Sequence, residues 1–380
     1  MKTSYILDRI YFDNAATTPL DPVVLEAMLP YMQNQFGNPS SIYSYGRETR
    51  LAIENARKSV AKMLGCKPGE IFFTSGGTES NNTAITASLR DLGCRHIISS
   101  PIEHHAVLHT VAYYEQTKKC TSSFVKLSDS GEVDYADLEE QLKQSTEKCL
   151  VTLMHANNEI GVLLDIERVG ALCQRYGAVF HSDCVQTVGH YPIDLSGIYI
   201  HFISAAGHKF HGPKGAGILY VRDTISINPL IFGGGQERNL RAGTENVYGI
   251  VGFAKALELA TANHAMERDY IEHLKKYMQA QLEENIPGVT FHCTGSATLY
   301  TVLSACFPKT QKSEFLLMSL DMNHICASGG SACSSGADQV SHVINALNKG
   351  ADHVTVRFSF SKYNTKAEVD VVVKKLADLI

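Results

Sequence analysis

The chain has 380 residues, of which 44% are hydrophobic and 19% are charged, with a net charge of −5 and a pI near 6.3. These values are typical of an ordinary globular protein and exclude a strongly basic nucleic-acid-binding surface. No window approaches the roughly 18 apolar residues of a membrane span, and ten cysteines without a Cys-x-x-Cys pair exclude a disulfide or zinc framework.

The first residues show neither a secretory nor a transit pattern. Together with the cysteine usage, which is typical of a reducing compartment, this absence predicts a cytoplasmic protein that stays where it is made.

Short apolar runs alternate with amphipathic segments through the first two-thirds of the chain. The runs predict strands at 70–74, 96–100, 123–127, 149–155, 178–183, 199–204 and 216–221. The segments between them predict helices at 46–64, 78–92, 105–117, 134–143 and 165–176, with Asp134 and Asp165 as N-caps. This alternation predicts an α/β fold with a mainly parallel, seven-stranded sheet covered on both faces.

The pattern changes after about residue 246. Helices are predicted at 246–262, 264–284, 313–321, 339–347 and from residue 366, with strands at 289–292, 300–306 and 353–359. This part predicts a smaller α+β domain. The large domain is placed at 15–260, and the small domain at 1–14 and 261–380.

Lys209 follows one of the predicted buried strands within the run Gly207-His208-Lys209 and ahead of Gly212-Pro213. A lysine among small residues at a strand end can be partly desolvated, which lowers its pKa and makes the amine nucleophilic toward a carbonyl. Such an amine suits a Schiff base with pyridoxal phosphate (PLP). The alternative is a surface lysine in a Gly-Pro turn.

Two further strand ends carry suitable groups for such a cofactor. Gly76-Gly77-Thr78 joins a strand to a helix start, where backbone N–H groups can hold a phosphate. Asp183 ends another strand and can pair with a pyridinium nitrogen, while Gln186 can donate to a ring oxygen. The alternative for Gly76-Gly77-Thr78 is a plain tight turn, and the alternative for Asp183 is a helix cap.

His104, at a further strand end, can stack on an aromatic cofactor and move protons, or be merely structural. His105 and His109 share a helix face, but no third ligand accompanies them, so no metal site is predicted. Arg357 lies inside a strand pattern and suits a substrate carboxylate or a buried ion pair.

Two loops are rich in small residues. Thr244 follows the triplet Gly233-Gly234-Gly235 and could reach a phosphate in its own subunit or in a partner. Cys333 lies in the run 328–336, where glycines and serines give no apolar wall, so its thiol is suited to receive a sulfur atom. Cys326, beside Ile325, is more suited to a core.

Taken together, these segments resemble the cysteine desulfurases of the NifS/IscS-like group, within the class V aminotransferase family of PLP-dependent enzymes. The similarity extends over nearly the whole chain, in family order. Its motifs are the runs at 11–19, 36–41, 74–80, 154–161, 204–215, 241–246, 328–336 and 357–359.

The resemblance implies a PLP fold of type I, a homodimer and conversion of L-cysteine to L-alanine, with a persulfide on Cys333. Lys209 would carry the cofactor, and His104 would stack on it and transfer protons. The other cofactor-binding residues would be Gly77, Thr78, Asp183, Gln186, His208 and, from the second subunit, Thr244. Asn157 and Arg357 would hold the substrate carboxylate. The sulfur would pass to an acceptor protein serving iron–sulfur cluster assembly or tRNA thiolation.

One departure from the family pattern affects the cofactor site. Ala206 stands where relatives usually have a serine that contacts the phosphate, so one hydrogen bond is expected to be missing. The rival functions are transamination or selenocysteine lysis on the same fold, and a non-catalytic sulfur-relay or scaffold protein.

Overall fold

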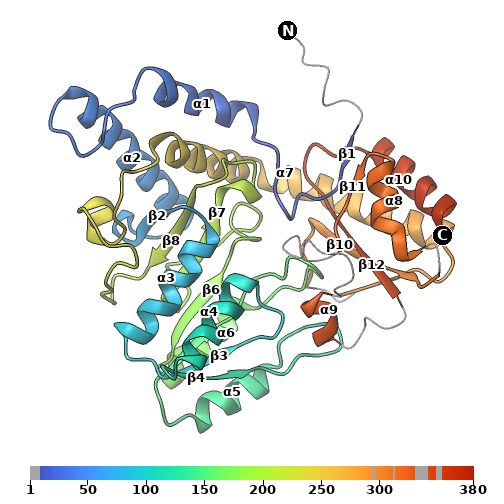
Figure 1. Cartoon of the computed structure of the whole chain (residues 1–380), viewed down its shortest axis with the longest axis horizontal. Coiled ribbons are helices and arrows are strands. Elements are labelled where there is room, and N and C mark those ends of the chain that lie inside the picture. Colours follow the sequence, from blue (N-terminus) through green and yellow to red (C-terminus); the bar gives the residue numbers. More distant parts are fainter. Residues whose placement is uncertain (1–8, 294–296, 311–312, 330–340, 348–352) are drawn as a thin grey trace.

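The computed structural model describes residues 9–293, 297–310, 313–329, 341–347 and 353–380 (Figure 1). Cys333, predicted to receive sulfur, lies outside the described residues. Within this part of the chain, no helix is long and apolar enough to cross a membrane.

A seven-stranded sheet forms the centre of the larger unit, in the order β2-β8-β7-β6-β5-β3-β4. All neighbours are parallel except β8, which is antiparallel to β2 and β7. The strands are β2 (Ile71–Thr74), β3 (His96–Ser99), β4 (Thr121–Phe124), β5 (Cys149–Thr152), β6 (Val179–Asp183), β7 (Phe202–Ala206) and β8 (Gly217–Val221). Each corresponds to a predicted strand, so the mainly parallel seven-stranded sheet is confirmed, with ends shifted by up to three residues.

Helices cover both faces of this sheet. One face packs on α3 (Gly77–Arg90) and α4 (His105–Gln116), and the other on α2 (Ser44–Met63), α5 (Tyr135–Gln144), α6 (Ile166–Tyr176) and the start of α7 (Val247–Asn285). The predicted caps are confirmed, because Asp134 accepts from Ala136 and Asp137 N–H groups, and Asp165 from Arg168 N–H. Helix α1 (Pro22–Gln33) was not predicted; it begins with one proline and contains a second, Pro30, which disguise it as a broken segment.

The prediction of two helices, at 246–262 and 264–284, is wrong, because the structure has the single 39-residue helix α7. No glycine or proline lies between residues 253 and 285, so nothing interrupts the backbone hydrogen bonds there. Phe253 and Leu257 pack in the core of the larger unit, whereas Leu274 and Met278 pack in that of the smaller one. The domain boundary predicted at residue 260 therefore falls inside one helix.

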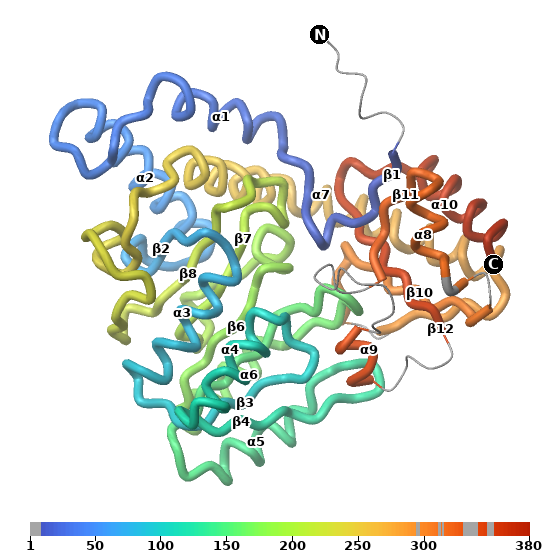
Figure 2. Tube along the Cα trace, in the orientation of Figure 1, coloured from blue at the N-terminus to red at the C-terminus, as the bar shows by residue number. Residues whose placement is uncertain are grey.

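The smaller unit contains an antiparallel sheet of β9 (Thr290–Phe291), β10 (Val302–Pro308) and β12 (His353–Ser359), in the order β12-β10-β9. The second half of α7 and α10 (Lys366–Leu379) pack beside it, with α8 (Leu316–Met322) completing the core. Strand β1 (Ile10–Tyr11) also joins this unit, since it pairs with β11 (Ile325–Cys326) (Figures 1 and 2). A short helix, α9 (His342–Ala346), packs through Val343 and Ile344 against Ile102, Ile160 and Val162.

Candidate active site

A cavity of about 290 Å³ opens at the carboxyl ends of the central strands, between the two units. Active sites of open α/β sheets commonly occupy this edge. The cavity is lined by Ala15, Ala16, Gly77, Thr78, Asn81, His104, His105, Met154, Ala156, Asn158, Glu159, Asp183, Val185, Gln186, Ala206, His208, Lys209, His342 and Arg357. Eight of the residues predicted for the site, from Gly77 to Arg357, are thus brought together.

Lys209 reaches the cavity from a short 3-10 turn, Gly207–Lys209, directly after β7. Its Nζ donates to the carbonyl oxygens of Ala15 at 2.7 Å and Ala16 at 2.9 Å. These carbonyls belong to the segment that enters the larger unit from β1. The amine is therefore held by backbone dipoles at the point where the two units meet.

Asp183 and Gln186 approach the cavity from the end of β6. The Oδ2 of Asp183 accepts a hydrogen bond from Asn81 Nδ2 at 2.6 Å, and its Oδ1 accepts one from Val185 N–H. Gln186 Nε2 donates to Ala15 O at 3.0 Å. Asn81, four residues after Gly77 on α3, was not predicted, since its inward direction depends on how α3 packs.

His104 is the N-cap of α4, where its Nδ1 accepts a hydrogen bond from Ala106 N–H at 3.0 Å. The acceptor role of Nδ1 places the proton of the neutral ring on Nε2. Burial lowers the pKa of His104, while Asp183 opposes this effect and Lys209 adds to it. The lowered pKa favours the neutral ring, which has an N–H at Nε2.

Glycines and a histidine shape the end of the cavity at the start of α3. A Cβ on Gly77 would meet Val185 Cγ2 at 2.5 Å, so only glycine fits there. Burial, with Lys209 and Lys214 nearby, lowers the pKa of His208 to about 4. Backbone N–H groups of the helix start, a threonine hydroxyl and a neutral imidazole therefore surround this end.

Arg357 comes from β12 and brings a buried cation to the cavity. Its side chain is 1% exposed, its Nη2 lies 2.6 Å from Asp13 Oδ1, and its Nη1 donates to Asn158 O at 2.9 Å.

The amide of Asn157 was expected to hold a substrate carboxylate, but in the structure its hydrogen bonds are to backbone groups. Nδ2 donates to Ile102 O, and Oδ1 accepts from the N–H groups of Glu159 and Ile160.

Asn157 itself is fully buried, and the cavity is instead lined by Asn158 and Glu159. Burial raises the pKa of Glu159, a residue that the sequence did not single out. Its carboxylate accepts a hydrogen bond from Ser341 at the start of α9. His342, also not predicted, places its ring centroid 4.5 Å from that of His105.

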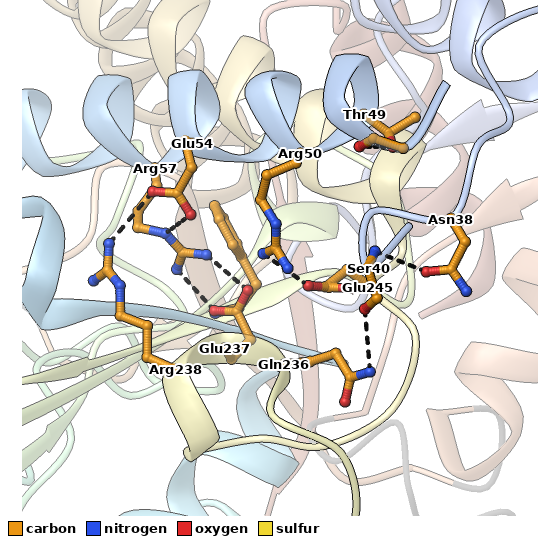
Figure 3. A network of polar contacts seen from close by, with 12 residues as sticks. Asn38, Ser40, Thr49, Arg50, Glu54, Arg57, Gln236, Glu237, Arg238 and Glu245 are labelled. Carbon is orange, nitrogen blue, oxygen red and sulfur yellow. Dashed lines mark hydrogen bonds and ion pairs between the residues drawn. The ribbon is translucent and has the colours of Figure 1, made fainter. Parts of the chain in front are cut away.

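Thr244 is exposed and does not line the cavity of its own chain. Its loop, residues 236–245, is fixed by ion pairs with α2 (Figure 3). Arg57 forms a bidentate pair with Glu237, both N···O distances being 2.8 Å, and Arg50 pairs with Glu245 at 3.0 Å. The loop therefore presents Thr244 outward from a rigid base.

Cys326 lies in β11 and is partly buried, and burial raises the pKa of its thiol. A thiol with a raised pKa is a weak nucleophile at neutral pH. This property disfavours Cys326 as a sulfur acceptor.

The family described as aminotransferase class-V matches residues 10–372. This chain belongs to the class V aminotransferase family. The cysteine desulfurase IscS of Dictyoglomus turgidum is 42% identical over 98% of this chain and 94% of its own length. The cysteine desulfurase IscS of Methanosarcina thermophila is 41% identical over 98% of this chain and 92% of its own.

Solved structures agree with this membership in the class V family. A NifS-like protein superposes with a TM-score of 0.90 at 37% identity, over 97% of this chain and 98% of its own. SspA, solved in complex with cysteine, superposes with a TM-score of 0.81 at 32% identity, over 94% of this chain and all of its own. The class V chain thus shares its fold with NifS-like enzymes.

Proposed function

We propose that this chain is a PLP-dependent cysteine desulfurase, which converts L-cysteine to L-alanine and forms a persulfide on Cys333. The observation that carries the proposal is the single cavity in which Lys209, Asp183 and His104 meet Arg357. The names of two similar relatives, both cysteine desulfurases, support the choice of substrate and reaction.

The groups around the cavity fit PLP. Lys209 offers an amine for the aldehyde, Asp183 a carboxylate for the ring nitrogen, and Gln186 an amide for the ring oxygen. Gly77, Thr78 and His208 would hold the phosphate, and the His104 ring would stack on the pyridine. When bound, PLP supplies an electron sink that stabilises negative charge at the substrate Cα.

The protein's own groups then have distinct tasks. Arg357 would orient the substrate by its carboxylate, since its planar fork matches that geometry. Asn157 would support this site by shaping the turn that brings Asn158 O to Arg357. His104 would deliver the proton on Nε2, and the Cys333 thiolate would accept sulfur from the substrate.

We further propose a homodimer in which Thr244 completes the phosphate site of the partner. Large apolar side chains are also exposed in the single chain: Phe36 is 71%, Ile42 89% and Phe232 75% exposed. Burying them against a second copy would be favourable by roughly 1.5–3 kcal/mol for each side chain.

The persulfide sulfur would pass to an acceptor protein for iron–sulfur cluster assembly or tRNA thiolation, in the cytoplasm. Buried free thiols such as Cys94 and Cys173 suit a reducing compartment.

The test is to mix purified protein, PLP and L-cysteine without any 2-oxo acid and to measure alanine, together with sulfide in the presence of a thiol reductant. We expect equal amounts of the two products, and none with the Lys209→Ala variant. Alanine formed only with a 2-oxo acid would indicate transamination. An absorbance spectrum that does not change on adding PLP and cysteine would indicate a non-catalytic protein.

A further inference from the structure

A carboxylate occupies the first turn of α3, next to the proposed phosphate site. Glu79 follows Thr78 directly, and its side chain is only 10% exposed. Its Oε2 accepts a hydrogen bond from Ser75 N–H at 2.9 Å. Arg241 approaches the same carboxylate with two donors, Nε at 2.9 Å from Oε1 and Nη2 at 3.2 Å from Oε2.

Glu79 is ionised in this arrangement. Burial alone would raise its pKa, but the hydrogen bonds from Arg241 and Ser75 outweigh burial, so the pKa of Glu79 is lowered. A helix start attracts anions through its unpaired N–H groups and its dipole. Without a cation beside it, the Glu79 carboxylate would itself occupy the positive end of the helix. It would also repel a phosphate dianion bound at the neighbouring residue.

We propose that Arg241 is a positioning residue for the cofactor phosphate, acting through the charge of Glu79. By pairing with both carboxylate oxygens, Arg241 cancels the negative charge at the start of α3 and leaves the N–H groups of Gly77 and Thr78 to the phosphate. The inference rests on the proposed PLP site and names a residue that does not itself line the cavity.

Arg241 belongs to the 236–245 loop, whose ion pairs with α2 are drawn in Figure 3. Glu237 is 2% exposed and accepts from Phe73 N–H at 2.8 Å, besides its two bonds from Arg57. Residues 237–239 all have positive φ angles, of 43°, 57° and 66°, a conformation that non-glycine residues adopt only when other contacts impose it. The loop conformation is therefore fixed by contacts other than those of Arg241, and it holds Arg241 in place.

Neutralisation and simple tethering predict different mutant patterns. If Arg241 cancels the charge of Glu79, Arg241→Gln should weaken PLP binding by about tenfold or more. Glu79→Gln should keep the wild-type affinity within about threefold, and adding Glu79→Gln to Arg241→Gln should restore most of the loss. If the pair is only a tether, Glu79→Gln should be as harmful as Arg241→Gln, and the double variant no better.

The measurement is PLP affinity of the apoprotein by absorbance titration, alongside pyridoxal, which lacks the phosphate. Arg241→Gln should lower PLP affinity and leave pyridoxal affinity unchanged, and its deficit should shrink as salt is raised. Inorganic phosphate should compete with PLP less well in Arg241→Gln than in wild type. Arg175→Gln, which breaks an exposed pair with Glu139 away from the cavity, is the matched control and should change nothing.

Arg241→Lys, which keeps the charge, and the double variant guard against misfolding of Arg241→Gln; both should bind PLP nearly as well as wild type. Equal losses of PLP and pyridoxal affinity, or a harmful Glu79→Gln, would overturn the inference. If wild-type protein binds PLP but Arg241→Gln binds it equally well, only this inference fails. If wild-type protein binds no PLP, the proposed function fails with it.

Discussion

The buried pair of Arg57 and Glu237 allows a stability prediction from its geometry. Arg57 is fully buried, and its Nη1 also donates to Ile71 O at 2.7 Å. Arg57→Ala would leave the Glu237 carboxylate buried and without its cation, which typically costs about 3–5 kcal/mol. With an unfolding entropy of about 2.1 cal/mol/K per residue, each kcal/mol lowers the melting temperature of a 380-residue chain by only about 1.3 °C. We therefore expect a decrease of about 4–6 °C.

The assay is thermal unfolding followed by circular dichroism, on protein without PLP so that ligand binding does not mask the change. The double variant Arg57→Met with Glu237→Gln removes both charges and keeps an acceptor for Phe73 N–H, so it should recover at least half of the loss. Arg175→Ala, at an exposed ion pair, should stay within about 1 °C of wild type. An Arg57→Ala protein that melts within about 2 °C of wild type would refute the reasoning.

Four further predictions concern the proposed chemistry. Borohydride reduction followed by peptide mapping should label Lys209, and Lys209→Ala should lose the label; a label elsewhere contradicts the assignment. Cys333→Ser should still bind PLP but form almost no alanine, and mass spectrometry after brief exposure to cysteine should find added sulfur on the Cys333 peptide, whereas Cys326→Ser should stay active. Ala206→Ser should tighten PLP binding about tenfold, since a hydrogen bond to a charged group contributes about 1.5–3 kcal/mol; unchanged affinity would mean that another donor already fills the place. Light scattering should give a dimer, and a fully active monomer would rule out a cross-subunit role for Thr244.

Much of the fold follows from sequence pattern because the central strands are short, apolar and bounded by polar turns. The pattern failed where local signals and packing disagreed. Pro30 interrupts the helical sequence pattern of α1, although the helix continues past it. Helix α7 passes through an exposed polar stretch around Asn263, which in the sequence suggests that the helix ends there. That stretch lies between the two cores, where neither buries the helix, so its polarity reflects its surroundings and not a break.

The candidate site was predictable to the extent that strand ends locate side chains. Asp183 and Lys209 follow strands of one parallel sheet, so their meeting at one edge follows from topology. The direction of the Asn157 amide does not follow from topology, because it is set by simultaneous hydrogen bonds to Ile102 O and from the N–H groups of Glu159 and Ile160. Glu159 was missed because only the folded chain brings it to the cavity, beside Ser341.

The continuity of α7 has a mechanical consequence. At 1.5 Å per residue its 39 residues make a beam about 58 Å long, anchored in one core at each end. A continuous helix resists a change in the angle between the two units. The distance between Lys209 and Arg357, on opposite sides of the cavity, is therefore set before any ligand binds. The two sides of the cavity therefore stay aligned while ligands bind and leave.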